Sequence, residues 1–200
     1  MPDTGAPYFI PFADPTDLVR DWPALSEDVA EAVADGLDAA GGLVAVKSAI
    51  FTGVQVASVT ARNNLSVTDL TITHALADAS NKLIISAFLG AAGSSGGFGL
   101  VGIAVHDGTG LIAIGDADGD RTRVTAGGLV SPSGTNFIVT MPSVTFVHAP
   151  NTTDSRTYTV RAINISGNTQ TLFINRSENN SNAEFIQRAV SSLVVQEVRA

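Results

Sequence analysis

The chain has 200 residues and a net charge of −8 with only 11 lysines and arginines, which excludes the broad basic face needed to bind nucleic acid phosphates. It contains no cysteine, which excludes disulfide bonds, thiolate zinc sites and a cysteine nucleophile. Charged residues make up 15% of the chain, against roughly 25% in an average soluble domain, while 44% is hydrophobic. Because subunit interfaces are depleted in charge, this shortage indicates that part of the surface is covered by another subunit.

Residues 1–25 are predicted to form an extended arm. Pro2, Pro7, Pro11 and Pro15 fall close together there, and proline prevents regular backbone pairing. The arm is also rich in large apolar side chains, which are a liability when exposed to water, so we expect it to dock on a partner protein. The residues expected to anchor it are Tyr8, Phe9, Ile10, Phe12, Leu18 and Trp22.

Residues 26–42 are predicted to form one short helix. Ser26 is suited to cap its N-terminus, Glu27 and Asp28 place negative charge at the positive end of the helix dipole, and Gly41-Gly42 ends it. The apolar positions form one narrow stripe at helical spacing, which suits packing against copies of the same helix. The stripe consists of Val29, Val33, Leu37 and Ala40.

Residues 43–200 are predicted to form a single antiparallel β-sandwich. Runs of Val, Ile, Thr and Phe alternate with turn sequences such as Asp107-Gly108 and Ser166-Gly167-Asn168. No amphipathic stretch of ten or more residues interrupts them, so parallel units with crossover helices are disfavoured. The candidate strands are Val44–Phe51, Val54–Thr60, Asp69–His74, Lys82–Leu89, Leu100–His106, Leu111–Gly115, Arg121–Thr125, Phe137–Met141, Val144–His148, Arg156–Ile165, Thr169–Asn175 and Val190–Val198.

Two stretches are apolar on both faces of the predicted sheets. In Lys82–Leu89 successive side chains point to opposite faces, and Ile84 and Phe88 make the second face apolar as well. The stretch Phe137–Phe146 is similar. Without covering helices, such strands need something on their second face, and we expect a neighbouring subunit there.

Two glycine motifs overlap in one segment. Gly93–Gly97 matches the G-x-S-x-G nucleophile elbow, and Gly97–Gly102 matches the G-x-G-x-x-G dinucleotide fingerprint. Each motif needs a helix directly after it, whereas Leu100–His106 has the pattern of a strand. We interpret the segment as a connection between strands. The chain is therefore expected not to be an enzyme, with no catalytic and no cofactor-binding residues.

Two groups of residues were considered as metal ligands. Three carboxylates at alternate positions could bind Ca²⁺, although the glycine and glutamate of the EF-hand pattern are missing and an acidic turn is the favoured interpretation. These are Asp116, Asp118 and Asp120. Three histidines near strand ends could meet in space, although isolated polar residues are ordinary there. These are His74, His106 and His148. No bound metal is expected from either group.

Several segments carry a resemblance to phage proteins. Thr16–Pro23, Ser26–Ala30 and Gly36-Leu37 resemble N-terminal regions of bacteriophage tail-fibre and other virion-attached proteins. Residues 43–200 are similar to small jelly-roll domains appended to phage fibres, loosely like the tumour necrosis factor fold. The segments that carry this similarity are Ile50–Gly53, Asn81–Ile85, Gly115-Asp116, Arg121–Val124, Tyr158–Val160, Phe173–Ser177 and Ser192–Val198.

The resemblance implies a homotrimeric structural protein on the exterior of a phage particle. Residues 1–25 would be anchored to other virion proteins, residues 26–42 would trimerise, and the jelly rolls would pack around a three-fold axis. A short tail fibre or tail-associated protein, with the β-domain contacting host-surface glycans, is the leading reading. The chain departs from long fibres because no coiled-coil shaft separates Gly41 from Leu43.

Two alternatives stay open. One is a capsid decoration or head fibre protein from the same kind of particle. The other is a free carbohydrate-binding module, although the β-domain offers only Tyr158 and a few Phe side chains for an aromatic platform. Membrane insertion is not expected, because no apolar run reaches the ~18 residues that span a bilayer.

Overall fold

The computed structural model describes residues 42–96, 100–128, 139–181 and 188–200, which form a mainly β fold. Every strand pairing in this part of the chain is antiparallel, as the sequence predicted, and no helix occurs in it. The predicted arm and its anchoring residues lie outside the described residues. So does the predicted helix with its stripe, apart from Gly42, which precedes the first strand.

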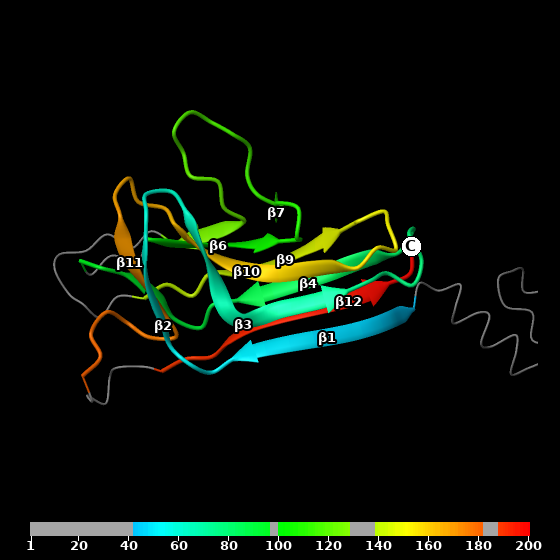
Figure 1. The fold of residues 1–200 in the computed structure, drawn as a ribbon, viewed down its shortest axis with the longest axis horizontal. Helices are drawn as coiled ribbons and strands as arrows, with labels where there is room; N and C mark the ends of the chain where they lie inside the picture. The colour runs from blue at the N-terminus through cyan, green and yellow to red at the C-terminus, as the bar shows by residue number, and fades with distance from the viewer. Residues whose placement is uncertain (1–41, 97–99, 129–138, 182–187) are drawn as a thin grey trace, which may run out of the picture.

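The strands form three sheets, which Figure 1 shows along the length of the molecule. The four-stranded sheet has the order β1 (Leu43–Phe51), β12 (Ser191–Val198), β4 (Lys82–Phe88) and β9 (Ser143–His148). The five-stranded sheet has the order β3 (Asn64–His74), β10 (Arg156–Asn164), β6 (Val101–His106) and β7 (Leu111–Ile112), with β8 (Ala126–Gly128) also paired to β6. The three-stranded sheet has the order β2 (Gln55–Val59), β11 (Gln170–Ile174) and β5 (Ala92–Ser94).

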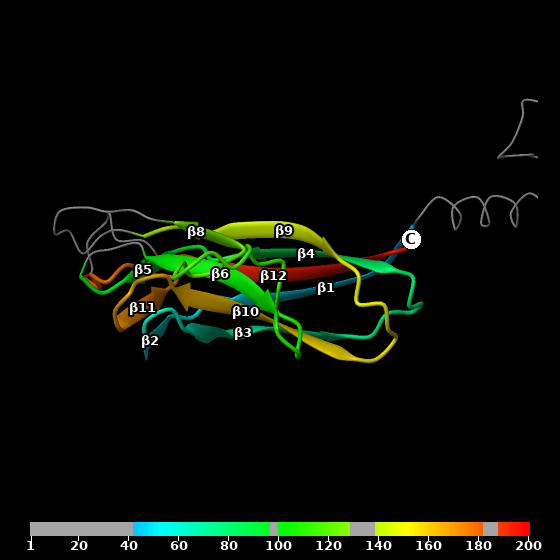
Figure 2. The same ribbon diagram turned by 90° about the horizontal axis from the view of Figure 1, so that it is seen from above.

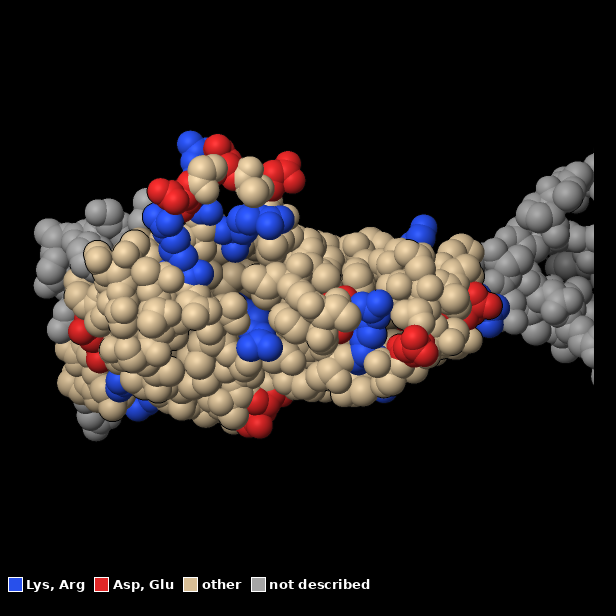
Figure 3. Space-filling view, turned by 45° about the horizontal axis from the view of Figure 1, so that its top comes forward, with Lys and Arg blue, Asp and Glu red and all other residues tan. Residues whose placement is uncertain are grey.

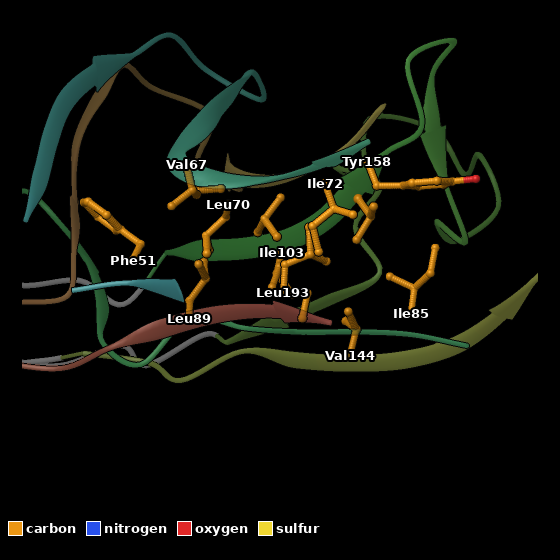
Figure 4. Packing of buried hydrophobic residues seen from close by; sticks show 14 of the residues in the cluster. Phe51, Val67, Leu70, Ile72, Ile85, Leu89, Ile103, Val144, Tyr158 and Leu193 are labelled. Atoms are coloured by element: carbon orange, nitrogen blue, oxygen red, sulfur yellow. The ribbon is translucent and has the colours of Figure 1, made fainter. Parts of the chain in front are cut away.

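The two larger sheets lie face to face as two layers, which Figure 2 shows edge-on. Their facing side chains form the core, where Leu193 and Ile85 from one sheet meet Leu70, Ile103 and Tyr158 from the other (Figure 4). All five are at most 1% exposed. Each such side chain contributes roughly 1.5–3 kcal/mol by its removal from water, so this core is the main source of stability.

A buried asparagine joins the three-stranded sheet to the four-stranded sheet. Asn175 follows β11 with a φ of 62°, a left-handed conformation that asparagine tolerates better than most residues. Its side-chain nitrogen donates to the carbonyls of Phe51 (2.8 Å) and Gly53 (2.9 Å), and its oxygen accepts from the Ser191 hydroxyl (2.6 Å). The end of β1 and the start of β12 are thereby held against the same side chain.

Two segments differ from the predicted strands. Arg121–Thr125 is a loop, and the strand β8 begins only at Ala126, because the arginines turn outward to pair with the same loop instead of joining β6. Ala92–Ser94 is the strand β5, although small residues gave no strand signal there. It forms because all three residues are buried against β11.

The predicted strand Phe137–Met141 is described only from Val139 onward, since residues 129–138 lie outside the described part. Thr140 makes an isolated antiparallel bridge to Ala92, and the strand β9 begins at Ser143. By contrast, β3 is longer than predicted and starts at Asn64. Its pairing with β10 is irregular near Asp69, whose φ of 60° marks the break.

Candidate functional site

The outward face of the four-stranded sheet is unusual because it exposes several large apolar side chains to solvent. The register of the four strands places alternate residues of each strand on this face, in rows that cross the sheet. We call this set the outer face: Val44, Val46, Ser48, Ile50, Ser192, Val194, Gln196, Val198, Lys82, Ile84, Ser86, Phe88, Ser143, Thr145 and Val147. Lys82 is the one charged residue in the set.

Several apolar side chains of the outer face are open to solvent. Val147 is 64% exposed, Ile50 is 61% exposed and Val46 is 52% exposed. Ile84 and Phe88 on β4 lie between them and are partly exposed. Polar side chains lie among them, because Ser48, Ser86 and Thr145 fall in one row across the sheet and the hydroxyls of Ser86 and Thr145 are 3.0 Å apart. Exposed apolar side chains grouped on one face are typical of interaction sites. The structure places Ile84 and Phe88 together on this face, as the alternation predicted, with Lys82 and Ser86 beside them, whereas a subunit covering the face stays a prediction.

The outward face of the five-stranded sheet is polar and provides the internal comparison. Facing hydroxyls pair across β3 and β10, with Thr71 to Thr159 at 3.2 Å and Thr73 to Thr157 at 3.1 Å. Arg161 donates to the Ser66 hydroxyl on the same face. Both outward faces thus carry paired hydroxyls, and the outer face differs by also exposing the large apolar side chains of Val46, Ile50 and Val147.

The edge strand β1 of the four-stranded sheet carries a lysine that hinders pairing with another strand. β1 is an edge strand, and its Lys47 points toward the other layer, where the Nζ donates to the carbonyl of Thr73 at 2.8 Å. An inward-pointing lysine on an edge strand hinders pairing with a strand of another molecule. Association through the outer face is therefore favoured over extension of the sheet at this edge.

A buried carboxylate ties the two layers together and was missed from the sequence. Glu197 on β12 is 1% exposed and accepts hydrogen bonds from the Ala77 amide (2.8 Å) and the Asn81 side chain (2.6 Å). Its other oxygen lies 2.8 Å from the Nε2 of His74 on β3. Burial raises the pKa of Glu197, but the hydrogen bonds from Asn81, Ala77 and His74 outweigh it and hold the pKa below its usual value. Side chains alternate along β12, and this alternation places residue 197 inward. It is the feature of the sequence from which a buried carboxylate could have been predicted.

A second carboxylate is buried in the five-stranded layer. Asp107 is 3% exposed, and one oxygen accepts from the Thr109 amide (2.9 Å), the Thr109 hydroxyl (2.6 Å) and the Gly110 amide (3.0 Å). The other oxygen accepts from Arg156 on β10 at 2.5 Å. Burial opposes ionisation, but these hydrogen bonds and the guanidinium outweigh it and lower the pKa of Asp107 to about 2.

The ring of His148 on β9 completes this second cluster. Its Nε2 lies 3.9 Å from Asp107 and has no hydrogen-bond partner in the described part of the chain. The ring packs edge-on against Tyr158, with centroids 5.9 Å apart. Burial lowers the pKa of His148, and the neighbouring Arg156 adds to this effect while Asp107 opposes it. Burial also raises the pKa of Tyr158 to about 12, so at neutral pH both rings are uncharged packing elements.

The residues considered as metal ligands do not come together. Asp118 pairs with Arg121 at 2.5 Å, and Asp120 pairs with Arg62 at 3.2 Å. Among the described residues, no group of three His, Cys, Asp or Glu side chains is placed to hold a metal ion. The histidines are also divided, since His74 belongs to the Glu197 cluster and His148 to the Asp107 cluster. Neither group therefore has the geometry of a metal site among the described residues.

The glycine motifs have the strand context that was expected of them. Ser94 ends β5, and the hydroxyl of Ser95 donates to Gln170 at 2.6 Å while accepting from the Thr171 amide at 3.0 Å. Residues 97–99 lie outside the described part, and the chain then enters the strand β6. A nucleophile elbow or a dinucleotide loop would lead into a helix at this point.

Comparison with known proteins leaves the outer face as the main guide to function. No protein-family model matches the chain, and no curated protein matches its sequence. The described residues contain no helix long and apolar enough to cross a bilayer.

Replacement of Asp107 by asparagine should destabilise the protein in a pH-dependent way. The folded-state pKa of about 2 lies below the ordinary value of 3.8, so ionised Asp107 stabilises the fold above about pH 4, and this contribution is lost as the pH falls toward 2. Loss of the buried charge should lower the free energy of unfolding by about 3 kcal/mol at pH 7, because Arg156 is left unpaired. Urea denaturation of both proteins between pH 7 and pH 2.5 measures this.

The control for this prediction is Asp154→Asn, which removes an equal charge from an exposed position. It should change the free energy of unfolding by less than about 0.5 kcal/mol at every pH. A difference between wild type and Asp107→Asn that is absent at pH 7, or that stays constant down to pH 2.5, would contradict the assignment.

Proposed function

We propose that this protein is a structural, self-assembling component of a phage virion, namely a short trimeric tail fibre or tail-associated protein. The observation that carries the proposal is the outer face of the four-stranded sheet, with Val46, Ile50, Ile84, Phe88 and Val147 arrayed on one surface. A protein that works as a monomer would have little reason to keep such a surface in contact with water.

Copies of the same chain are the occupants that best fit this face. The chain carries a net charge of −8, so two copies repel each other over most of their surfaces. The outer face is the region where that repulsion is weakest, since Lys82 is its one charged side chain. Charge depletion at the centre of a contact surface is also the compositional mark of protein interfaces.

The size of the outer face is sufficient for a stable contact. Four strands about 4.8 Å apart, each with about seven residues at roughly 3.4 Å per residue, give a flat footprint on the order of 450 Å². The accessible surface of the side chains on such a footprint is larger, so it approaches the roughly 800 Å² per partner that stable interfaces bury. Together with the stripe Val29, Val33, Leu37 and Ala40, this supports assembly of three chains in parallel.

The jelly-roll assignment and the virion location belong to the same proposal. Two facing antiparallel sheets with long connections between them are what a jelly roll requires. The resemblance of residues 1–25 to virion-attached arms supplies the anchor, and its aromatic residues supply the apolar contacts. In this arrangement the β-domain projects from the particle, and its loops are free to contact host-surface glycans.

Replacement of Ile84 by lysine should dissociate the assembly into monomers. Ile84 lies on the central strand β4 of the outer face, and burying a lysine there in every copy places like charges together without partners. Analytical ultracentrifugation at micromolar concentration measures the mass. Val147→Lys, on the neighbouring strand β9, should have the same effect without disturbing the monomer, since Val147 is largely exposed.

The matched control is Thr71→Lys, which adds the same charge to the polar face of the five-stranded sheet. It should leave the mass unchanged. If both outer-face variants assemble normally while keeping a wild-type circular dichroism spectrum, the outer face is not the contact between subunits.

Removal of residues 1–25 should separate assembly from attachment. The core of the described domain lies entirely after residue 42, so the shortened protein should fold and keep its mass. It should fail to join particles, which co-sedimentation with particles assembled in its absence measures. Normal incorporation of the shortened protein would rule out the anchor.

A further inference from the structure

A cavity of about 370 Å³ lies between the five-stranded sheet and the loop of residues 113–125, which connects β7 to β8 and projects at the top of Figure 1. Leu111, Ile114 and Ile163 give this cavity an apolar part. Ile163 occupies an outward position of β10 and is still only 2% exposed, because the loop covers it. The cavity is thus built on the sheet and bordered by the loop, and it is open to solvent, since the side chains of Asp120 and Arg121 are 93% and 83% exposed.

The base of the loop is fixed to the sheet, which sets where the loop borders the cavity. Val124 packs over Gly102 of β6 so closely that a Cβ at Gly102 would lie 2.5 Å from its Cγ1. The Gly115 amide donates to the carbonyl of Val124 (3.2 Å), and the Thr125 amide donates to the carbonyl of Ile103 (3.0 Å). Largely preformed pockets of this size are typical of small-molecule sites.

Three arginines line the cavity, out of only 11 lysines and arginines in an acidic chain. They are Arg62, Arg121 and Arg123, and Asp120 is the one carboxylate among the described lining residues. Figure 3 shows blue side chains gathered at the base of the projecting loop and red ones along it. Cations gathered at one hollow of a negatively charged protein favour an anionic ligand there.

The arginines keep donors free for such a ligand. Arg123 uses its Nε to bind the carbonyl of Gly115 at 2.6 Å, which fixes the plane of the guanidinium and leaves both terminal nitrogens without a partner in the described part of the chain. Arg62 and Arg121 each make one ion pair, with Asp120 and Asp118. Both pairs are largely solvent-exposed, and exposed ion pairs contribute little, so an incoming anion can compete with them.

We propose that this cavity binds one carboxylate-bearing sugar unit, such as a uronic acid residue of a polysaccharide. The carboxylate pairs with the fork of Arg123 and with Arg62, which suits the planar, bidentate geometry of arginine. The side chains of Asn64 and Thr122 meet the ring hydroxyls, and Leu111 and Ile114 meet the apolar face of the ring. A role as a receptor site rests on the proposed attachment function, whereas the binding itself does not.

Isothermal titration calorimetry of the full-length protein tests this inference, with glucuronate, glucose and inorganic phosphate as three separate ligands. Glucuronate should bind saturably, and glucose at least about tenfold more weakly because it lacks the charge. Arg123→Gln should weaken glucuronate binding at least about tenfold. Asp120→Asn should strengthen it a few fold, because Arg62 loses its competing partner. The control Arg188→Gln, which removes a charge from an exposed position outside the cavity, should change nothing.

Three results would overturn the inference: no saturable binding of glucuronate, equal binding of glucose, or an unchanged affinity in Arg123→Gln. Phosphate binding as tight as glucuronate would show a bare anion site and overturn the assignment to a sugar. A monomeric protein that binds glucuronate as described would contradict the proposed assembly and leave this inference standing, so the two failures are distinguishable.

Discussion

The four-stranded sheet has an apolar inner face, and its outer face also exposes apolar side chains among its serine and threonine residues. The inner face, with Ile85 and Leu193, packs against the five-stranded sheet and forms the core. The outer face, with Ile84, Phe88 and Val147, has no described element over it. Apolar surface gains about 25 cal/mol for each Å² removed from water, so the exposed face is a standing driving force for association.

Contacts between the layers hold the four-stranded sheet against the five-stranded sheet. Glu197 joins β12 to β3 through His74, and His148 on β9 packs against Tyr158 on β10, beside the Asp107–Arg156 pair of the five-stranded layer. Both clusters connect one layer to the other, and Asn175 does the same between β11 and the strands β1 and β12. Surfaces held in this way lose little conformational entropy on association, which favours a specific contact.

Local patterns in the sequence were enough for the antiparallel β class, for most strands and for the two-sided character of β4. Alternation of side chains is a property of neighbouring residues, so it can be recognised without the fold. The strand β5 and the loop position of Arg121–Thr125 depend on pairing with distant segments, and no local pattern reports that. An apolar second face was predicted along Lys82–Leu89 and along Phe137–Phe146, but in the described part of the second stretch the outward residues are Ser143 and Thr145. The full extent of the outer face requires the register of four strands far apart in the chain. The arginine cavity escaped notice for the same reason, since Arg62 and Arg123 meet only in the folded chain.

The solution mass of the full-length protein tests the central claim most directly. Sedimentation equilibrium over a range of protein concentrations should give a mass about three times the 20.5 kDa of one chain, persisting at low micromolar concentration. High salt should not dissociate this assembly, because the proposed contact is apolar. A mass of 20.5 kDa at every concentration would contradict the account, because the outer face would then be in contact with water in the functional protein.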